Sequence, residues 1–227
     1  SRHLAFMLEA SPVVLYTLHL SPEGAVPTWI SANITRLFGY DEQEVLSPDW
    51  WQSHLHPDDR EEVLRNMDRL TTDGHLVHEY RFFDADGAVC WIRDEMRLLP
   101  SGSDKASQEV LGAWQDTTSS RQSAQIQQTR LIALDSLARG KPLKSVLMTI
   151  AQRLENTRPE LRVSILLRNP SDRCLYTAAA PSLPDSFNAE VDGLSPEVGY
   201  GSCGTSMPTA KPLIVEDIST HPYWPNH

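Results

Sequence analysis

Basic residues are few in this chain of 227 residues. It has 20 Lys and Arg against 30 Asp and Glu, which gives a formal net charge of -10 at pH 7. Proteins that bind duplex DNA or anionic membrane surfaces normally present a basic face, and no compact run of Lys and Arg could form one here. Nucleic acids and anionic membranes are therefore not expected partners.

Cysteine is also scarce. The three cysteines, Cys90, Cys174 and Cys203, are far apart in the sequence and never form a C-x-x-C pair. An odd number of separated cysteines does not suit a disulfide framework and gives no zinc signature. We therefore expect a cytoplasmic protein without a metal site.

Long apolar runs are missing as well. The longest stretches, around residues 13–18 and 131–137, fall well short of the roughly 20 residues that span a bilayer. We expect no membrane segment within these residues. Because the first residue is Ser rather than Met, the sequence reads as a piece of a longer protein, and an upstream targeting segment or anchor stays open.

The chain has enough apolar residues, 40%, to build a core, and its length favours two domains. The first part alternates strands and helices without room for parallel crossovers, so it predicts an α+β domain with an antiparallel sheet. The expected strands are 13–20, 27–32, 75–83, 88–99 and 107–118, and the expected helices are 4–8, 32–40, 41–46 and 56–70.

The helix over 56–70 begins with four carboxylates, Asp58, Asp59, Glu61 and Glu62. Paired carboxylates can serve acid–base catalysis, but negative charge also stabilises the N-terminus of a helix. We interpret this cluster as helix-start electrostatics and expect no catalysis from it.

Residues 117–140 have no strand pattern and predict a connecting helix that stops at Gly140. A 3-4-3-4 spacing of about two heptads runs along it, which is short for a lone coiled coil. Two interpretations stay open, pairing in a dimer and packing on the neighbouring domain. The spaced positions are Ala124, Gln127, Leu131, Leu134 and Ala138.

The last part predicts a helix over 143–157 and strands over 161–169, 174–180 and 211–219. Between them Gly199, Gly201 and Gly204 have the G-x-G-x-x-G spacing. The residues before Gly199 are polar and interrupted by proline, so the strand that a dinucleotide site requires is absent.

Cys203 lies inside this glycine triplet, and several roles are open to it. A nucleophile would need a base such as His221 within reach. A redox-sensitive or nitric-oxide-sensitive thiol is a second interpretation. We favour the third, a small and mostly buried thiol in a tight loop.

Residues 12–118 carry the stretches ITRLFGYDEQEVL, LHPDDR, EYRFFDADGAVCWIRD and GAWQDTT, and in sum these resemble a PAS domain of the PAS_3 type. Asp116-Thr117-Thr118 looks like the Asp-Ile-Thr motif that joins PAS sheets to an outgoing helix, with Thr117 departing at the middle position. The resemblance implies a five-stranded antiparallel sheet with helices on one face. It implies sensing, dimerisation or both, and no catalytic residue.

A PAS cavity would lie between the sheet and the long helix. The large side chains expected to line it could equally fill a solid core, and we favour that interpretation. Residues 31–56 hold no cysteine, so a flavin photoadduct is ruled out. Haem would need an axial ligand such as His54, His56 or His78, which we expect instead at the surface or hydrogen-bonded. No bound cofactor is expected, although haem and flavin stay open. The candidate pocket residues are Tyr16, Trp29, Trp51, Met67, Phe82 and Trp114.

Residues 141–227 carry LARGKPLKSVLMTIAQRLE (starting just upstream), PSLPDSFN, GLSPEVGYGSCGTSM and KPLIVEDISTHPYW, which resemble the first half of a GAF domain. The resemblance implies an antiparallel sheet with helices, of which the last GAF elements are missing from these residues. It also implies a ligand-binding loop at Gly201, Cys203, Gly204 and Thr205. This GAF type occurs upstream of bacterial GGDEF and EAL enzymes of cyclic-di-GMP and of some histidine kinases.

The expected organisation is therefore a PAS domain over 1–118, a signalling helix over 119–140 and a partial GAF domain over 141–227. We expect a sensing and dimerising module that is not itself an enzyme. The expected output is a diguanylate cyclase or a cyclic-di-GMP phosphodiesterase. The alternatives are a sensor histidine kinase, a ligand-free PAS dimerisation platform and, less favoured, an enzyme that uses Cys203. A homodimer and a small-molecule ligand are the expected partners.

Overall fold

The computed structural model describes residues 2–21, 24–99, 108–158 and 160–224. Contacts along the chain define two compact units, unit 1 (Ser1–Arg121) and unit 2 (Gln122–His227). Helix α6 (Thr118–Ala138) begins in unit 1 and continues in unit 2. No helix within the described ranges is long and apolar enough to cross a membrane.

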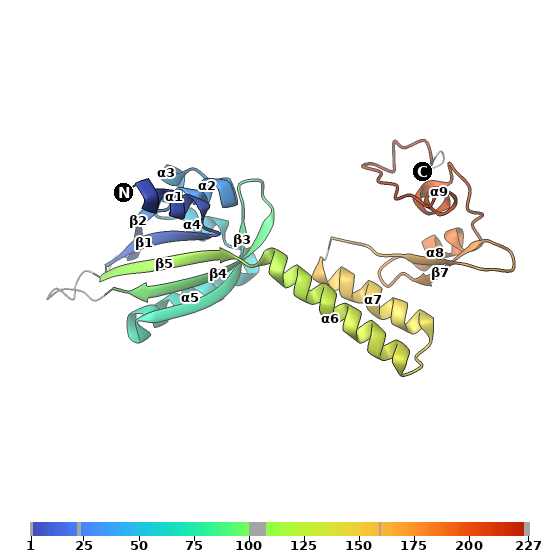
Figure 1. The fold of residues 1–227 in the computed structure, drawn as a ribbon, viewed down its shortest axis with the longest axis horizontal. Helices are drawn as coiled ribbons and strands as arrows, with labels where there is room; N and C mark the ends of the chain where they lie inside the picture. Colours follow the sequence, from blue (N-terminus) through green and yellow to red (C-terminus); the bar gives the residue numbers. More distant parts are fainter. Residues whose placement is uncertain (1, 22–23, 100–107, 159, 225–227) are drawn as a thin grey trace. The chain divides into compact units, whose positions relative to one another are not determined.

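Unit 1 is built on one five-stranded sheet with strand order β2-β1-β5-β4-β3, in which all neighbours are antiparallel (Figure 1). This confirms the predicted α+β class and the predicted sheet. Its elements are α1 (Arg2–Ala10), β1 (Val13–Ser21), β2 (Gly24–Ile30), α2 (Asn33–Phe38), α3 (Glu42–Val45), α4 (Trp50–His54), α5 (Pro57–Asp73), β3 (His75–Phe83), β4 (Val89–Leu98) and β5 (Gln108–Asp116).

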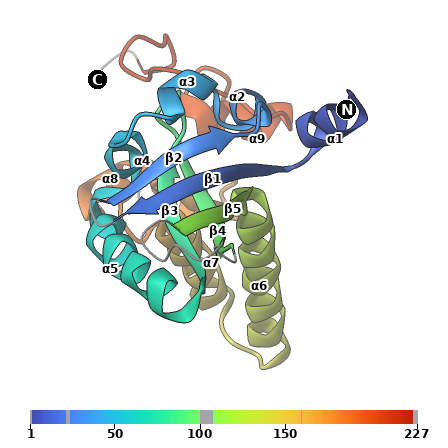
Figure 2. The same ribbon diagram turned by 90° about the vertical axis from the view of Figure 1, so that its left-hand side faces the viewer.

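The core of unit 1 lies between one face of the sheet and the helices α2 to α5 (Figure 2). Side chains alternate strictly along β3, where Leu76, His78, Tyr80 and Phe82 are buried and the residues between them are not. Helix α5 packs along this strand and buries Val63 and Leu70. It ends at Gly74, whose φ of 71° is the left-handed conformation that favours glycine.

Helix α4 was not among the predicted elements. Its five residues are too few to show a helical period, and Trp50 at its start is buried against the rings of Tyr40 and Phe82. Tertiary packing of one large side chain therefore holds this turn in place, rather than local propensity.

Gly112 of β5 leaves room for an aromatic ring. It pairs with Tyr16 of β1, and a Cβ added to it would lie 2.0 Å from Cζ of that ring. Gly112 has no positive φ, so the glycine is needed for space and not for backbone conformation. The Tyr16 ring can therefore cross over β5 and place its hydroxyl 2.7 Å from Asp94 of β4.

Unit 2 contains the remainder of α6, α7 (Leu143–Thr157), β6 (Ile165–Arg168), β7 (Leu175–Ala179), α8 (Asp185–Val191) and α9 (Gly201–Thr209). Strands β6 and β7 form a two-stranded antiparallel sheet, and Leu175 makes one further bridge to Leu194. Helix α7 has the predicted bounds. Helix α8 was not among the predicted elements.

The strand predicted over 211–219 is wrong. These residues are mostly irregular, with isolated bends and a turn from residue 218, and Ile214 is 89% exposed. Its alternating apolar residues resemble a strand, but a strand needs a neighbour to accept its backbone hydrogen bonds. In the described part of unit 2, β6 and β7 are the only strands that pair in a sheet, and residues 211–219 join neither.

Replacing Gly112 with Ala is expected to destabilise unit 1 by at least about 2 kcal/mol, because the methyl group overlaps the Tyr16 ring. The free energy of unfolding from urea denaturation measures this. In a Tyr16→Leu background the same Gly112→Ala change should cost little, since the ring is gone. Equal costs in both backgrounds would show that the ring does not need the space.

Candidate functional site

A cavity of about 360 Å³ lies in unit 1 between the sheet, the segment of α3 and α4, and helix α5. The sheet contributes residues of β1, β2, β4 and β5, including Tyr16, Ile30, Met96 and Trp114. Helix α5 contributes Leu64, Met67, Asp68, Leu70 and Thr71, and the α3–α4 segment contributes Val45, Leu46, Ser47, Pro48, Trp50, Trp51 and Gln52. The volume is that of a site for a small molecule.

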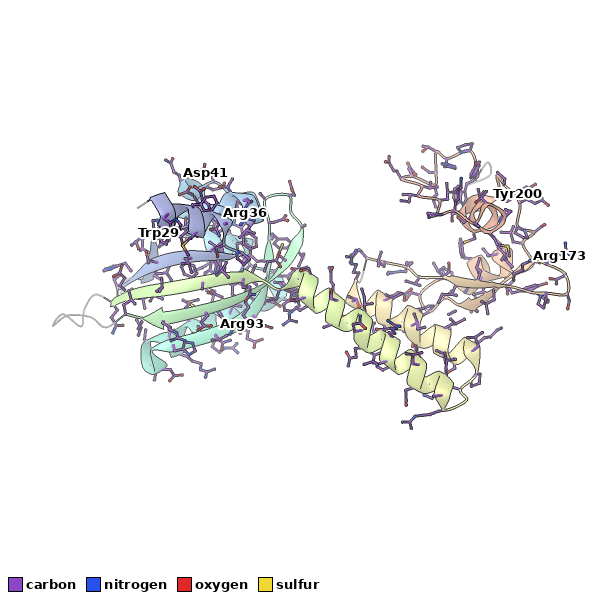
Figure 3. The ribbon with its side chains drawn as sticks, in the orientation of Figure 1. Trp29, Arg36, Asp41, Arg93, Arg173 and Tyr200 are labelled. Carbon is purple, nitrogen blue, oxygen red and sulfur yellow. The ribbon has the colours of Figure 1, made fainter. Side chains whose placement is uncertain are left out.

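Five of the six residues predicted for a PAS pocket line this cavity, namely Tyr16, Trp29, Trp51, Met67 and Trp114. Trp29 lies on β2 (Figure 3), and its exposed fraction is 42%. Phe82 is not a lining residue. It is fully buried in the core, with its ring centroid 5.5 Å from that of Trp50 and 5.3 Å from that of Trp114.

A buried hydrogen-bond network underlies the cavity. Asp94 is completely buried, and its carboxylate accepts from the hydroxyls of Tyr16 at 2.7 Å and Tyr80 at 3.0 Å. The Tyr80 hydroxyl in turn accepts from Nε1 of Trp51 at 3.0 Å. Burial raises the pKa of Tyr16 and of Tyr80 well above the usual tyrosine value, and the nearby Asp94 raises both further.

This network fixes which polar groups face the cavity. Tyr16 and Trp51 both line it, but the hydroxyl of one and the indole N–H of the other are already donated within the protein. Because both tyrosines stay protonated, they remain donors to Asp94 across the usual pH range. These two residues therefore present mainly ring surface to the cavity.

Sequence reasoning missed Asp94, although the sequence held a signal. In β4 the residues Ile92, Asp94 and Met96 share one face, so a carboxylate interrupts an otherwise apolar inward pattern. A charged side chain on a buried face is seldom tolerated without hydrogen-bond donors.

None of the three histidines considered as haem ligands lines the cavity. Nδ1 of His54 contacts the Trp50 carbonyl at 2.7 Å, and His56 caps α5. The prediction for His78 is wrong, because it is neither exposed nor hydrogen-bonded. Its ring is buried with Nε2 3.5 Å from Asp94, and neither nitrogen has a hydrogen-bond partner among the described residues.

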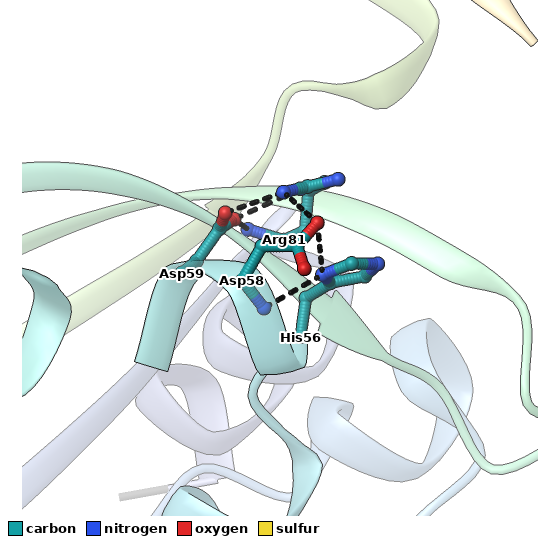
Figure 4. Close-up of polar contacts among 4 residues, drawn as sticks. All are labelled: His56, Asp58, Asp59 and Arg81. Atoms are coloured by element: carbon teal, nitrogen blue, oxygen red, sulfur yellow. Dashed lines mark hydrogen bonds and ion pairs between the residues drawn. The ribbon is translucent and has the colours of Figure 1, made fainter. Parts of the chain in front are cut away.

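His56, Asp58, Asp59 and Arg81 join the start of α5 to β3 (Figure 4). The Arg81 guanidinium donates to both oxygens of Asp59, at 2.6 and 3.0 Å, and its backbone N–H also donates to Asp59 at 2.8 Å. The hydrogen bond from the Arg81 side chain lowers the pKa of Asp59, and the bond to Asp59 raises the pKa of Arg81. The predicted carboxylates at 58 and 59 thus serve helix placement.

Arg81 also faces Trp91 of β4, with the guanidinium carbon 5.9 Å from the ring centroid. Arg121 of α6 lies over the same ring, with its guanidinium carbon 4.2 Å from the ring centroid, and forms an ion pair with Glu79. We call Arg81, Trp91, Arg121 and Glu79 the junction cluster. In this cluster Arg81, which holds the start of α5, and Arg121, at the start of α6, both contact the ring of Trp91.

The backbone of Trp91 fixes the first residues of α6 as well. Its N–H donates to the Thr118 hydroxyl at 2.8 Å, and its carbonyl accepts from the Thr117 N–H at 2.8 Å. Asp116 accepts from the Thr118 N–H at 2.8 Å. The Asp116-Thr117-Thr118 motif therefore lies where strand β5 passes into α6.

In unit 2 a second cavity of about 360 Å³ is lined by three of the four predicted loop residues, Gly201, Cys203 and Gly204. Thr205 is buried beside it and accepts from the Gly199 N–H at 3.0 Å. The prediction of a mostly buried Cys203 is wrong, because this thiol is exposed on helix α9. Tyr200, which lies just before α9 (Figure 3), is also one of the residues that line this cavity.

Residues 27–113 match the family model PAS_3, described as the PAS fold. They form a PAS domain, a domain found in sensor proteins. The chain is similar to the methyl sulfide methyltransferase-associated sensor of Methanosarcina acetivorans, with 26% identity over 206 residues, or 88% of this chain and 20% of that protein. It is 30% identical over 125 residues to the two-component sensor PprA of Pseudomonas aeruginosa, which is 54% of this chain and 13% of that protein.

The chain thus spans a fifth or less of the length of these two relatives. Among solved structures, the sensory box histidine kinase/response regulator of Burkholderia thailandensis is 20% identical. That match covers 60% of this chain and 98% of the other with a TM-score of 0.43. A PAS domain from Colwellia psychrerythraea is 18% identical, covers 52% and 97% of the two chains, and has a TM-score of 0.43.

Replacing Arg81 with Met is expected to lower the free energy of unfolding by about 1–2 kcal/mol at pH 7, because Asp59 loses its charged donor. A lowered carboxyl pKa stabilises the fold above about pH 4 and ceases to do so as the pH falls through the folded value. The difference between the two proteins should therefore shrink towards pH 2.

Urea denaturation at pH 7 and at low pH measures both quantities. Arg65→Met is the matched control, because Arg65 makes an exposed pair with Glu61 on the same helix. This control should cost no more than about 0.5 kcal/mol. A pH-independent loss in Arg81→Met would assign the effect to packing instead of the Asp59 pair.

Proposed function

We propose that this chain is a sensory input region. The occupant of the PAS cavity sets the position of α5, and the junction cluster passes a change in α5 to the start of α6. The chain itself is not an enzyme, and α6 with unit 2 controls an output elsewhere in a longer protein. The observation that carries the proposal is the unbroken series of contacts from the cavity wall to α6 through Arg81 and Trp91.

Helix α5 is the first link, because it forms one wall of the cavity. Leu64, Met67 and Leu70 line the cavity from this helix. The helix begins at Pro57, and Arg81 ties its first turn to β3 through Asp59. A ligand that displaces the wall must therefore either strain this ion pair or move Arg81 with it.

The junction cluster is the second link. Trp91 faces Arg81 and Arg121 at the same ring and also holds Thr117 and Thr118 through its backbone. A shift of Arg81 changes the surroundings of the ring on which Arg121 stacks. Two discrete arrangements of such a packed cluster would give a switch rather than a gradual response.

The names of the relatives support a sensor, and one of them is a two-component sensor. This favours a histidine kinase as the output. A diguanylate cyclase or cyclic-di-GMP phosphodiesterase is the second candidate, supported by the GAF-like stretches of residues 141–227. The 206-residue match is longer than unit 1, so that relative shares part of unit 2 as well. We propose unit 2 as a partial GAF domain with its own ligand cavity beside Gly201, Cys203 and Gly204.

Filling the cavity should loosen the start of α6. Met67→Trp places a large ring in the cavity from α5, and backbone amides 119–124 are expected to exchange with deuterium at least about threefold faster. In an Arg81→Met background this effect should vanish, because the first link is cut. Hydrogen exchange followed by mass spectrometry measures the exchange of these amides in the single and in the double variant.

Arg65→Trp is the control for this experiment, since it adds the same side chain to an exposed position of the same helix. It should leave exchange in α6 unchanged. Unaltered exchange at 119–124 in a folded Met67→Trp protein, by circular dichroism, would contradict the proposed route.

A homodimer is part of the proposal. All five positions of the 3-4-3-4 spacing, Ala124, Gln127, Leu131, Leu134 and Ala138, are exposed on α6. Leu131 is 66% exposed and Leu134 is 53% exposed, whereas Ser136 on the opposite side of the helix is buried. The apolar row is therefore free to pack against the same row of a second copy, alongside contacts between PAS domains.

Leu131→Glu is expected to turn a dimer into a monomer, because it places a charge in the middle of the apolar row. Size-exclusion chromatography with light scattering gives the mass. Gln128→Glu adds the same charge at an exposed position outside the row and should leave the dimer intact. A monomeric unmodified protein at tens of micromolar would remove the dimer from the proposal.

A further inference from the structure

We infer that the PAS cavity takes an organic cation whose charge is surrounded by alkyl groups, such as a quaternary ammonium, and that the indole of Trp51 and the carboxylate of Asp68 hold this charge. The inference rests on the proposed function, in which the cavity holds a ligand. It adds the chemical class of that ligand.

The charges of the cavity wall favour a cation. No Lys, Arg or His is among the described residues that line it, and the one charged lining residue is Asp68 of α5. The whole chain carries a formal net charge of -10 as well. A ligand carboxylate or phosphate would enter without a cation to pair with, which is strongly unfavourable, whereas a cation is attracted.

The carboxylate of Asp68 is not used within the described part of the protein. The neighbouring arginines of α5 are engaged elsewhere, since Arg65 pairs with Glu61 and Arg69 pairs with Asp73. The hydrogen bonds that Asp68 accepts from nearby side chains go to its backbone carbonyl and not to its carboxylate. Asp68 is exposed and lines the cavity, so its charge can meet a ligand at the opening.

The indole of Trp51 has uncovered faces. Its Nε1 donates to the Tyr80 hydroxyl at 3.0 Å, and the two rings are inclined at 77°. Because this contact is made by the N–H edge of the indole, Tyr80 covers neither of its faces. Among the described residues the arginines that lie over an aromatic ring are both at Trp91, so no cation of the protein occupies Trp51.

The Trp51 ring is also within reach of a ligand, because this residue is half-buried and lines the cavity. Trp29 of β2, a second lining tryptophan, is exposed at the opening. An indole attracts a cation more strongly than the ring of Tyr or Phe does. The cavity therefore offers aromatic surface and one carboxylate, which together suit a single positive charge.

The scarcity of hydrogen-bond acceptors selects the kind of cation. Four tryptophans, two methionines and several aliphatic side chains line the cavity, and the lining polar side chains of Ser47, Gln52 and Thr71 are exposed at its opening. A primary ammonium brings three N–H donors, which this apolar interior would leave without side-chain acceptors. A quaternary ammonium has no N–H, and its methyl groups pack against apolar and aromatic walls.

Three probes of similar size test this class by equilibrium dialysis against the 227-residue protein at pH 7. Benzyltrimethylammonium carries the cation, neopentylbenzene is its uncharged carbon isostere, and phenylacetate is an anion. The cation is expected to bind at least about fivefold more tightly than the isostere. Phenylacetate is expected to bind at least about tenfold more weakly than the cation.

Two variants locate the charge, with circular dichroism as the check on folding. Asp68→Asn should weaken binding of the cation about twofold to fivefold and leave the isostere unchanged. Trp51→Leu should likewise reduce the preference for the cation while the isostere still binds. Glu62→Gln is the matched control, because it removes the same charge from an exposed position of α5 outside the cavity, and it should leave both affinities unchanged.

Equal binding of cation and isostere to the unmodified protein, or phenylacetate as the tightest ligand, would overturn the ligand class and leave the cavity as a binding site. A preference for the cation that persists undiminished in both Asp68→Asn and Trp51→Leu would overturn the assignment of these two residues. Met67→Trp fills the cavity and should prevent binding. Undiminished binding to this variant, or no binding of any of the three probes, would remove the cavity as a ligand site, and the proposed function would fail with it.

Discussion

The buried carboxylate of Asp94 is the constraint on which unit 1 depends. It lies on β4, and its two tyrosine donors come from β1 and β3, so one side chain links three of the five strands. Removing either donor would leave part of a buried charge unsatisfied. Gly112 is required because the Tyr16 ring must cross β5 to reach the carboxylate. The apolar character of the cavity follows too, because Tyr16 and Trp51 direct their polar atoms away from it.

The sheet and the long helix could be predicted from the sequence because their signals are local. The period-2 alternation of the strands and the carboxylates at the start of α5 each act within a few residues. Helix α4 and the stretch 211–219 could not be predicted in the same way. One depends on packing of Trp50 in the core, and the other lacks a strand to pair with.

The candidate site likewise has parts that could be predicted from the sequence and parts that could not. Aromatic and sulfur side chains of the cavity, such as Trp51 and Met67, could be chosen because large apolar residues on the inward face must pack around one space. Phe82 could not be separated from them, since depth within a core depends on neighbours from other strands. The junction cluster could not be predicted from the sequence either. Glu79, Trp91 and Arg121 are brought together only by strand pairing and by the position of the start of α6.

The contacts of Trp91 also define where this PAS domain can be cut and joined to another protein. Its backbone holds Thr117 and Thr118, and its ring holds Arg121, so the structural domain extends one helical turn beyond the last strand. A chimera that exchanges sequence directly after Asp116 would keep the sheet and lose the contacts of Trp91 with Thr117, Thr118 and Arg121. Joining after Arg121 would transfer the domain together with its own contacts to the helix, so the domain itself would set which side of the helix faces the sheet.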